Sequence, residues 1–368
     1  MQQTARGGLF GCAGVHNRVG RSTDGLILME QLAKQVPVEY GSDRNGLIWG
    51  YAFRAGAPAT PIRAEDVPSG PGAARSDGSF FWLHFAAANS NTERWLHQYV
   101  DLPAGFYNGL RASSSATRVE QDGDALVAVI NDVLFAFESD HPDVSTMTLG
   151  VLPGAMISAR LKPLRSIERL REAVKAGAIC RSPVDLLAHL LKNQADVLAE
   201  LVRKSGPQVD EIEDGLLTSH LRANRAQLST MRRMLVRLQR LMAPEPAALF
   251  RLLNRPPVWI AAEDLQELRQ TAEEFALVVG DCAALVERLK LVQEELVAMV
   301  NEQTNRSVLL LTFATVMLLP FNVVGGLFGM NVGGIPFAES AAGFWTVVVL
   351  ITAPTVLLGS LLLTRFRR

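Results

Sequence analysis

Two long apolar stretches lie near the C-terminal end of the sequence. No Asp, Glu, Lys or Arg occurs in residues 307–338, and after Glu339 none occurs in residues 340–364. Within them, residues 308–328 and 344–364 are each about 21 residues long, and a helix of that length spans about 30 Å of hydrocarbon. The pattern predicts two membrane-spanning helices, because a soluble domain has little room to bury two helices that are apolar on every side.

The residues before these stretches show helical periodicity. Residues 184–257 predict a helical hairpin and a connector, which ends in prolines that interrupt the pattern. The expected elements are a helix over 184–204, a turn at Ser205-Gly206-Pro207 and a second helix over 208–242. Residues 258–307 predict a stalk helix, which meets no proline before Pro320 and therefore continues into the first span.

The pattern of residues 41–183 is mixed and predicts a cytoplasmic α/β domain. Trp49, Tyr51 and Phe53 alternate as in a strand with one buried face. The expected elements are strands within 46–54 and 79–85, a helix over 91–99, and a hairpin within 125–136 that turns at Asn131-Asp132. Residues 1–40 have weak periodicity, and we interpret them as a leader, poorly ordered or arising from an upstream start. The expected fold class is an α+β membrane protein.

Positive charges flank the two predicted spans on one side only. Arg306 precedes the first span and a basic tail of residues 365–368 follows the second, whereas the loop of residues 329–343 contains no Lys or Arg. By the positive-inside rule, both ends of the chain are expected in the cytoplasm of a bacterial cell whose inner membrane the helices cross. The tail is placed to contact lipid phosphates.

Two stripes run along the predicted stalk helix. One is apolar and recurs every three or four residues, as in a helix-packing seam: Leu285, Leu289, Val292, Leu296 and Met299. The other carries Glu287, Glu294 and Asn301 at intervals of seven residues. The second stripe faces water, and the periodicity leaves open whether that water fills a lumen or surrounds the stalk.

A polar stripe continues into the first span, on one face of the predicted helix. Its polar members are Asn305, Thr312, Thr315 and Asn322, and the apolar positions Val308, Leu319 and Gly326 keep the same spacing. Polar side chains inside a bilayer need a partner or a water-filled lumen. A lumen predicts several copies of the chain around it, because two helices cannot enclose a pore; the alternative is bonding to helix carbonyls or to the second span.

Glycines gather where the first span ends. The run Gly329-Met330-Asn331 follows Gly325-Gly326 and precedes Gly333-Gly334. Glycine lets the backbone approach closely and leaves carbonyl oxygens free to face the water shell of a cation.

This arrangement resembles the CorA superfamily of divalent-metal transporters, whose hallmark is Gly-x-Asn at the end of the first of two C-terminal spans. The extended form from Gly329 to Pro336 is similar to the zinc-transporting ZntB branch, whereas the magnesium branch usually has a more acidic loop. The resemblance covers about residue 46 to the C-terminus. It implies a funnel-shaped homopentamer in which five first spans line a pore.

The resemblance also implies roles for single residues. The pore mouth would be formed by Gly329, Met330 and Asn331, and Glu294, with Glu287 one heptad away, would form an acidic ring in the stalk. The lining below the mouth would comprise Asn322, Leu319, Thr315, Leu311 or Thr312, Val308 and Asn305, together with Gly326. Asn322 stands where magnesium transporters have a hydroxyl, which leaves the dehydration of the ion open. Glu339, repeated around a ring, would concentrate cations at the entrance.

The expected function is transport of zinc, and with it cadmium, nickel or cobalt, with proton coupling suggested by the zinc branch. Residues 307–338 contain no His, Cys, Asp or Glu, so the ion is expected to pass largely hydrated, as cargo and not as a tightly bound cofactor. Two alternatives stay open. One is a magnesium or cobalt channel of the same fold, and the other is a membrane-anchored scaffold or sensor that conducts nothing.

Other chemistry has less support. The sequence has no Walker A loop, nucleophile elbow, H-E-x-x-H or C-x-x-C pair, which argues against an enzyme, and nothing in it points to nucleic acid. Its three cysteines are widely spaced and do not predict a disulfide framework. Candidate cytoplasmic metal ligands are Asp281, Cys282 and His220, while His84, His97 and His189 are isolated and more typical of hydrogen-bonded or exposed side chains.

Overall fold

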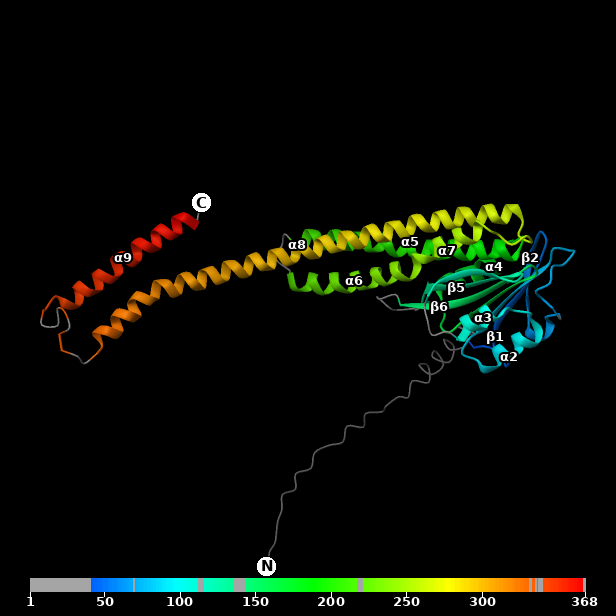
Figure 1. Ribbon diagram of the computed structural model, residues 1–368, viewed down its shortest axis with the longest axis horizontal. Coiled ribbons are helices and arrows are strands. Elements are labelled where there is room, and N and C mark those ends of the chain that lie inside the picture. The colour runs from blue at the N-terminus through cyan, green and yellow to red at the C-terminus, as the bar shows by residue number, and fades with distance from the viewer. Residues whose placement is uncertain are drawn as a thin grey trace, which may run out of the picture.

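The computed structural model describes residues 41–366, apart from residues 69, 112–115, 136–142, 217–220, 331–332, 335 and 337–339. The leader expected at residues 1–40 therefore lies outside the described residues. An α/β domain occupies one end of an elongated molecule, a bundle of long helices leaves it, and one of these helices continues far beyond the bundle (Figure 1).

A seven-stranded sheet organises the α/β domain, in the order β2-β1-β3-β7-β6-β5-β4. Only β3 and β7 pair in parallel; the other neighbours are antiparallel. The strands are β1 (Leu47–Arg54), β2 (Ala57–Ile62), β3 (Phe80–Ala86), β4 (Arg118–Asp122), β5 (Ala125–Val133), β6 (Val144–Leu152) and β7 (Ala155–Arg160). The strands predicted within 46–54 and 79–85 are confirmed.

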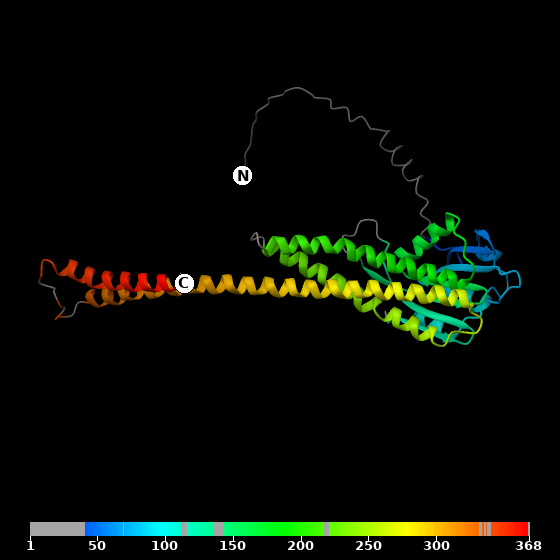
Figure 2. The ribbon, with the colours of Figure 1, turned by 90° about the horizontal axis from the view of Figure 1, so that it is seen from above.

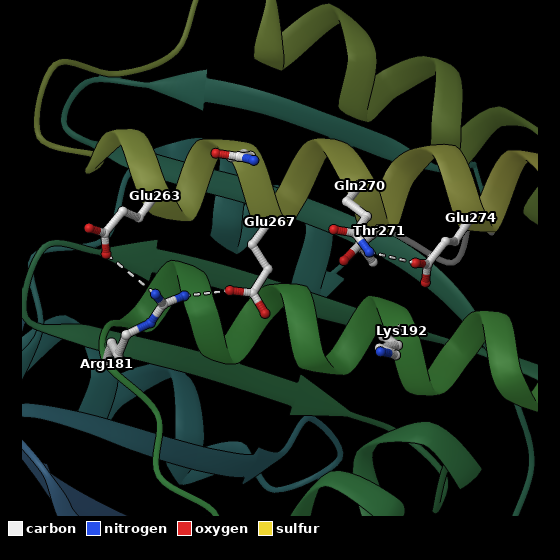
Figure 3. A pocket seen from close by; sticks show the side chains of 8 residues that line it. Arg181, Lys192, Glu263, Glu267, Gln270, Thr271 and Glu274 are labelled. Atoms are coloured by element: carbon white, nitrogen blue, oxygen red, sulfur yellow. Dashed lines mark hydrogen bonds and ion pairs between the residues drawn. The ribbon is translucent and has the colours of Figure 1, made fainter.

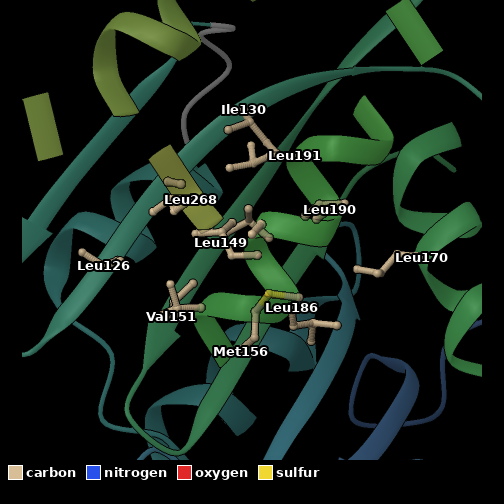
Figure 4. Packing of buried hydrophobic residues seen from close by; sticks show 14 of the residues in the cluster. Leu126, Ile130, Leu149, Val151, Met156, Leu170, Leu186, Leu190, Leu191 and Leu268 are labelled. Carbon is tan, nitrogen blue, oxygen red and sulfur yellow. The ribbon is translucent and has the colours of Figure 1, made fainter. Parts of the chain in front are cut away.

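Both faces of the sheet are covered, as alternation along β3 requires. Leu83 packs under the short η1 (Ala64–Asp66), α2 (Ser90–Tyr99) and α3 (Ala104–Arg111), and the predicted helix over 91–99 is confirmed as α2. Trp82 points to the other face, which is covered by α4 (Arg165–Lys175) and the long helices. Figure 4 shows this second layer, where Ile130 and Leu149 of the sheet meet Leu190 and Leu191 of α5 (Pro183–Leu216).

The hairpin predicted to turn at Asn131-Asp132 is wrong, because β5 continues through both residues. Asn131 and Asp132 are buried and each is bonded across the fold. The backbone N–H of Asn131 donates to Glu245 Oε1 at 2.8 Å, and Asp132 accepts from the backbone and the hydroxyl of Ser166 at 2.8 and 2.7 Å. The turn lies before β5 instead, at Gly123, whose φ of 64° suits glycine.

The turn predicted at Ser205-Gly206-Pro207 is also wrong. Helix α5 runs through Pro207, and the chain reverses only after Leu216, before α6 (Leu221–Met242). Packing explains the continuation, because Val209 and Ile212 are buried in the core that α5, α6 and α8 share. Helix α7 (Pro244–Leu253) likewise begins at a proline within the predicted connector, since proline is tolerated in the first helical turn.

The continuity of α5 can be tested with Gly206→Ala. A Cβ at Gly206 meets no atom within 4 Å, so the substitution is expected to raise the free energy of unfolding by about 0.5–1 kcal/mol, as for an open helix position. Denaturant unfolding of the purified protein measures the change. Gly123→Ala is the matched control and should destabilise, because its positive φ disfavours alanine although space is free. If Gly206→Ala lowered the free energy of unfolding instead, the result would favour the predicted turn over a continuous helix.

The predicted stalk helix is confirmed as α8 (Ala262–Phe328), 67 residues long and about 100 Å from end to end. The seam is confirmed too: Leu285, Leu289, Val292 and Leu296 are buried against α5 and α6, with Met299 partly buried. Helix α9 (Gly343–Phe366) then returns along the far end of α8, as Figures 1 and 2 show together.

Candidate functional site

The distal part of α8 is apolar and lies outside the bundle. This helix is long and apolar enough to cross a membrane, and none of its most apolar segment is buried inside the chain. The described side chains of α9 form a shorter apolar helix, Gly343–Leu357. Large exposed side chains such as Leu311 (69%) and Leu319 (58%) make a surface that a soluble monomer does not carry over such a length.

One face of distal α8 contacts α9. Phe313, Met317, Pro320 and Val324 recur at helical spacing and are partly buried, unlike the residues between them. A Cβ added to Gly359 of α9 would lie 3.4 Å from Met317 Sδ, so the two helices approach closely there. Small residues allow such approach between membrane helices.

The predicted polar stripe lies on the other side of α8. At 3.6 residues per turn, Asn322 and Thr315 lie nearly opposite the face that contacts α9, and Thr312 is displaced from that face by about a quarter turn. All described members of the stripe are exposed: Asn305, Val308, Leu311, Thr312, Thr315, Leu319, Asn322 and Gly326. Thr315 Oγ1 donates to the Leu311 carbonyl at 2.9 Å, which satisfies one hydroxyl within the helix. The stripe therefore points away from α9, the helix that packs beside distal α8 in the described part of the chain.

Helix α8 ends at the glycine-rich run. Gly329 is its C-cap and donates its N–H to the Gly325 carbonyl at 3.0 Å. Met330 is exposed, and Gly334 has a φ of 93°, a conformation that suits glycine. Asn331 and Glu339 lie outside the described residues, so their predicted places at a pore mouth stay predictions.

The acidic stripe of the stalk is exposed along the same helix. Glu287 lies 3.5 Å from Lys290 Nζ, and Glu294 lines a shallow groove together with Arg232. These contacts come from a single chain, so the acidic ring proposed from the resemblance stays a prediction.

The predicted cytoplasmic metal ligands are not brought together by the described part of the chain. Cys282 is buried in the seam, where its Sγ donates to the Leu235 carbonyl at 3.8 Å and burial raises its pKa to about 11. The neighbouring Asp281 is exposed, and His220 lies outside the described residues.

A different group of metal-ligating side chains lies close together: Cys180, Asp185 and His189. The sequence analysis treats His189 as isolated and Cys180 as one of three widely spaced cysteines, and it does not single out Asp185. A usable signal was present, because Asp185 and His189 are four residues apart at the start of a predicted helix and so share one face.

The histidines of the α/β domain have other roles. His84 is fully buried in the sheet, where burial lowers its pKa well below the usual range. His97 stacks on Tyr107 with ring centroids 3.8 Å apart.

Comparisons with known proteins agree with this architecture. The family model described as "CorA-like Mg2+ transporter protein" matches residues 77–368. The zinc transport protein ZntB of Pectobacterium carotovorum is 22% identical over 307 residues, which cover 83% of this chain and 91% of that protein.

The divalent cation transporter CmaX of Pseudomonas aeruginosa is 25% identical over 315 residues, covering 84% of this chain and 93% of CmaX. A solved structure of full-length CmaX superposes with a TM-score of 0.72 at 24% identity, covering 90% and 100% of the two chains. The CorA magnesium transporter of Methanocaldococcus jannaschii has a TM-score of 0.69 at 17% identity, covering 86% and 97%.

Proposed function

Since this chain belongs to the CorA-like Mg2+ transporter family, a family of membrane transporters of divalent cations and not of enzymes, we propose that its cargo is zinc. The ion crosses the bacterial inner membrane through a central pore shared by identical subunits. Both ends of the chain face the cytoplasm, and the basic tail contacts lipid phosphates.

The orientation of the polar stripe carries this proposal. Because Asn322 and its neighbours lie away from the α9 contact, copies of the chain can turn these faces toward a common axis while each α9 lies outside, toward lipid. The polar groups then border water instead of hydrocarbon, where their unsatisfied bonds would be costly. Five copies, as the resemblance implies, give a funnel with the α/β domains at the wide end.

Zinc as cargo is supported by the ZntB relatives, and the composition of the first span indicates how an ion would pass. Residues 307–338 offer no thiolate, imidazole or carboxylate, so an ion moves with its water shell held by amides and carbonyls. Asn331, with Gly329 and Met330, forms the mouth, and Glu339 attracts cations to it. No resident cofactor takes part.

The proposal is tested by flux into proteoliposomes that contain the purified full-length protein. Zinc uptake should exceed magnesium uptake measured side by side, and Asn322→Leu should lower zinc uptake about tenfold or more. The reason is that a bond to a hydrated cation is worth about 1.5–3 kcal/mol, and each subunit of the ring loses one.

Thr352→Val is the matched control, because Thr352 Oγ1 donates to the Val348 carbonyl at 2.7 Å within α9 and faces no proposed lumen. Its uptake should equal that of the wild type. Faster magnesium than zinc uptake would identify a magnesium channel. No uptake of any divalent ion by a correctly assembled protein would identify a scaffold or sensor.

A further inference from the structure

Three side chains of metal-binding types meet where α4 gives way to α5. One ligand atom each from Cys180, Asp185 and His189 lies within 4.8 Å of the other two. Cys180 and Asp185 are each 2% exposed, whereas the His189 side chain is 42% exposed. The group therefore has two buried members and one side open to solvent.

The Asp185 carboxylate is held in place by the backbone around it. Its Oδ2 accepts from the Arg181 N–H at 2.7 Å, and the Asp185 N–H donates to Ser182 Oγ at 3.0 Å. The other oxygen, Oδ1, lies 3.4 Å from His189 Nδ1, which donates to the Asp185 carbonyl at 2.9 Å. A metal bound through Nδ1 would replace that hydrogen bond. Ligating carboxylates are typically oriented by such secondary hydrogen bonds.

The donor set selects one class of ion. A thiolate, an imidazole and a carboxylate are the ligands of Zn²⁺ and of the neighbouring transition metals, whereas Mg²⁺ takes oxygen ligands. Bond lengths of about 2.0–2.3 Å place ligand atoms of a tetrahedral site about 3–4 Å apart, so a contraction of about 1 Å closes the site. A water molecule can fill the fourth position.

Arg181 now supplies the positive charge beside Asp185, with Nη2 3.5 Å from Oδ1. The same guanidinium pairs with Glu263 at 3.4 Å and with Glu267, both at the start of α8 (Figure 3). Asp264 Oδ1 lies 3.9 Å from its Nη2. A cavity of about 310 Å³ between α5 and α8 is lined by Arg181 and these two glutamates. The α8 carboxylates can therefore retain the guanidinium when a metal takes Oδ1.

We propose that Cys180, Asp185 and His189 form a binding site for a zinc-class divalent ion, outside the membrane helices, with Arg181 as the cation that the metal displaces from Asp185. The site does not depend on which ion the pore conducts. Because it adjoins the first turns of α8, it places a bound metal next to the helix that continues into the first span.

The test is a titration of metal-free, reduced, full-length protein with Co²⁺. The chain carries Cys12→Ser, so that this third thiol cannot contribute to the spectrum. One Co²⁺ per chain should produce a thiolate-to-cobalt charge-transfer band and the visible bands of a tetrahedral site. Added Zn²⁺ should remove both, and excess Mg²⁺ should not. A thiolate band cannot arise from the pore, since no cysteine follows Cys282.

Single substitutions show which side chains give rise to the charge-transfer band. Cys180→Ser should abolish it, and Cys282→Ser, the other described cysteine and equally buried, should keep it. His189→Ala, at a partly exposed position that the fold tolerates, should weaken Co²⁺ binding about tenfold or more. Arg181→Ala should bind Co²⁺ several-fold more tightly, because the competing charge is gone. A wild-type protein without the thiolate band, a band that survives Cys180→Ser, or unchanged binding in His189→Ala would overturn the site.

Discussion

Replacing Glu168 with alanine is expected to lower the free energy of unfolding by about 3–5 kcal/mol, because it leaves a buried guanidinium without its carboxylate. Glu168 Oε1 accepts from Arg160 Nη2 at 2.8 Å, and both side chains are almost fully buried. Arg171 lies 3.5 Å from the other oxygen and 4.3 Å above the Trp49 ring. The substitution therefore removes one anion from between two cations.

On its other side Arg160 contacts a chain of neutral hydrogen-bonding groups. Arg160 Nε donates to His84 Nε2 at 2.7 Å, which requires that nitrogen to be unprotonated. The other ring nitrogen of His84 lies 2.7 Å from Ser158 Oγ, to which Trp82 Nε1 also donates at 3.0 Å. These partners are neutral, so they do not supply the negative charge that Glu168 places beside Arg160.

Denaturant unfolding followed by tryptophan fluorescence measures the effect, since Trp49 and Trp82 lie in this layer. Glu120→Ala is the control in the same domain. Glu120 pairs with Arg118 at 3.2 Å on the surface, and the loss of such a pair costs less than about 1 kcal/mol. If the two variants lost the same free energy of unfolding, burial would not make the Arg160–Glu168 pair more important for stability than an exposed pair.

The long helix α8 could be predicted well from the sequence, because its signals are local. A run of apolar residues long enough to span a bilayer and a seam such as Leu285, Leu289 and Val292 need no knowledge of distant partners. The end of α8 at Gly329 follows from the same kind of local chemistry. The family assigned from this pattern is confirmed by the match over residues 77–368.

The errors occurred where distant partners override local preference. Asn131-Asp132 has the composition of a turn, but Glu245 and Ser166 satisfy these residues within a strand. Ser205-Gly206-Pro207 also has the composition of a turn, yet α5 continues because Val209 and Ile212, beyond the proline, are buried in the core shared with α6 and α8. The ion pair of Arg288 with Asp210, 2.6 Å apart on the surface, adds little to this. None of these partners is adjacent in sequence, so periodicity could not identify them.

In the candidate site, too, local patterns could be predicted from the sequence, whereas contacts between distant residues could not. The polar stripe of α8 was visible as a spacing, but its position away from α9 required the contact between Met317 and Gly359. The group of Cys180, Asp185 and His189 required the loop after α4 to bring the thiol onto the face of α5. The pore mouth proposed above would be shared by several copies of the chain, and the flux measurements test it.

Asp132 is expected to make the protein less stable as pH rises from about 4 to about 7. The carboxylate is fully buried, and burial raises its pKa to about 6 from a usual value of 3.8, although Ser166 donates two hydrogen bonds to it. Between these values the folded chain holds a proton that the unfolded chain has lost. The contribution to stability is therefore complete below about pH 4 and is lost as pH rises through 6, on the order of 3 kcal/mol in all.

Asp132→Asn should flatten this part of the stability profile, because the amide keeps bonding capacity toward Ser166 and does not titrate. Burial also raises the pKa of Glu245, and the Asp132 charge adds to that rise. Asp132→Asn removes this charge, so it also reduces the contribution of Glu245 to the loss of stability with rising pH. Glu200→Gln is the control: Lys204 and Arg169 lower the Glu200 pKa to about 2, so its contribution changes only below about pH 4.5. The midpoints of denaturant unfolding, measured for each variant from about pH 4 to about pH 7, test this prediction. A contrary result would be stability profiles of Asp132→Asn and Glu200→Gln that both run parallel to that of the wild type above pH 4.5. Asp132 would then be deprotonated in both the folded and the unfolded chain, and it would not be the source of the pH dependence.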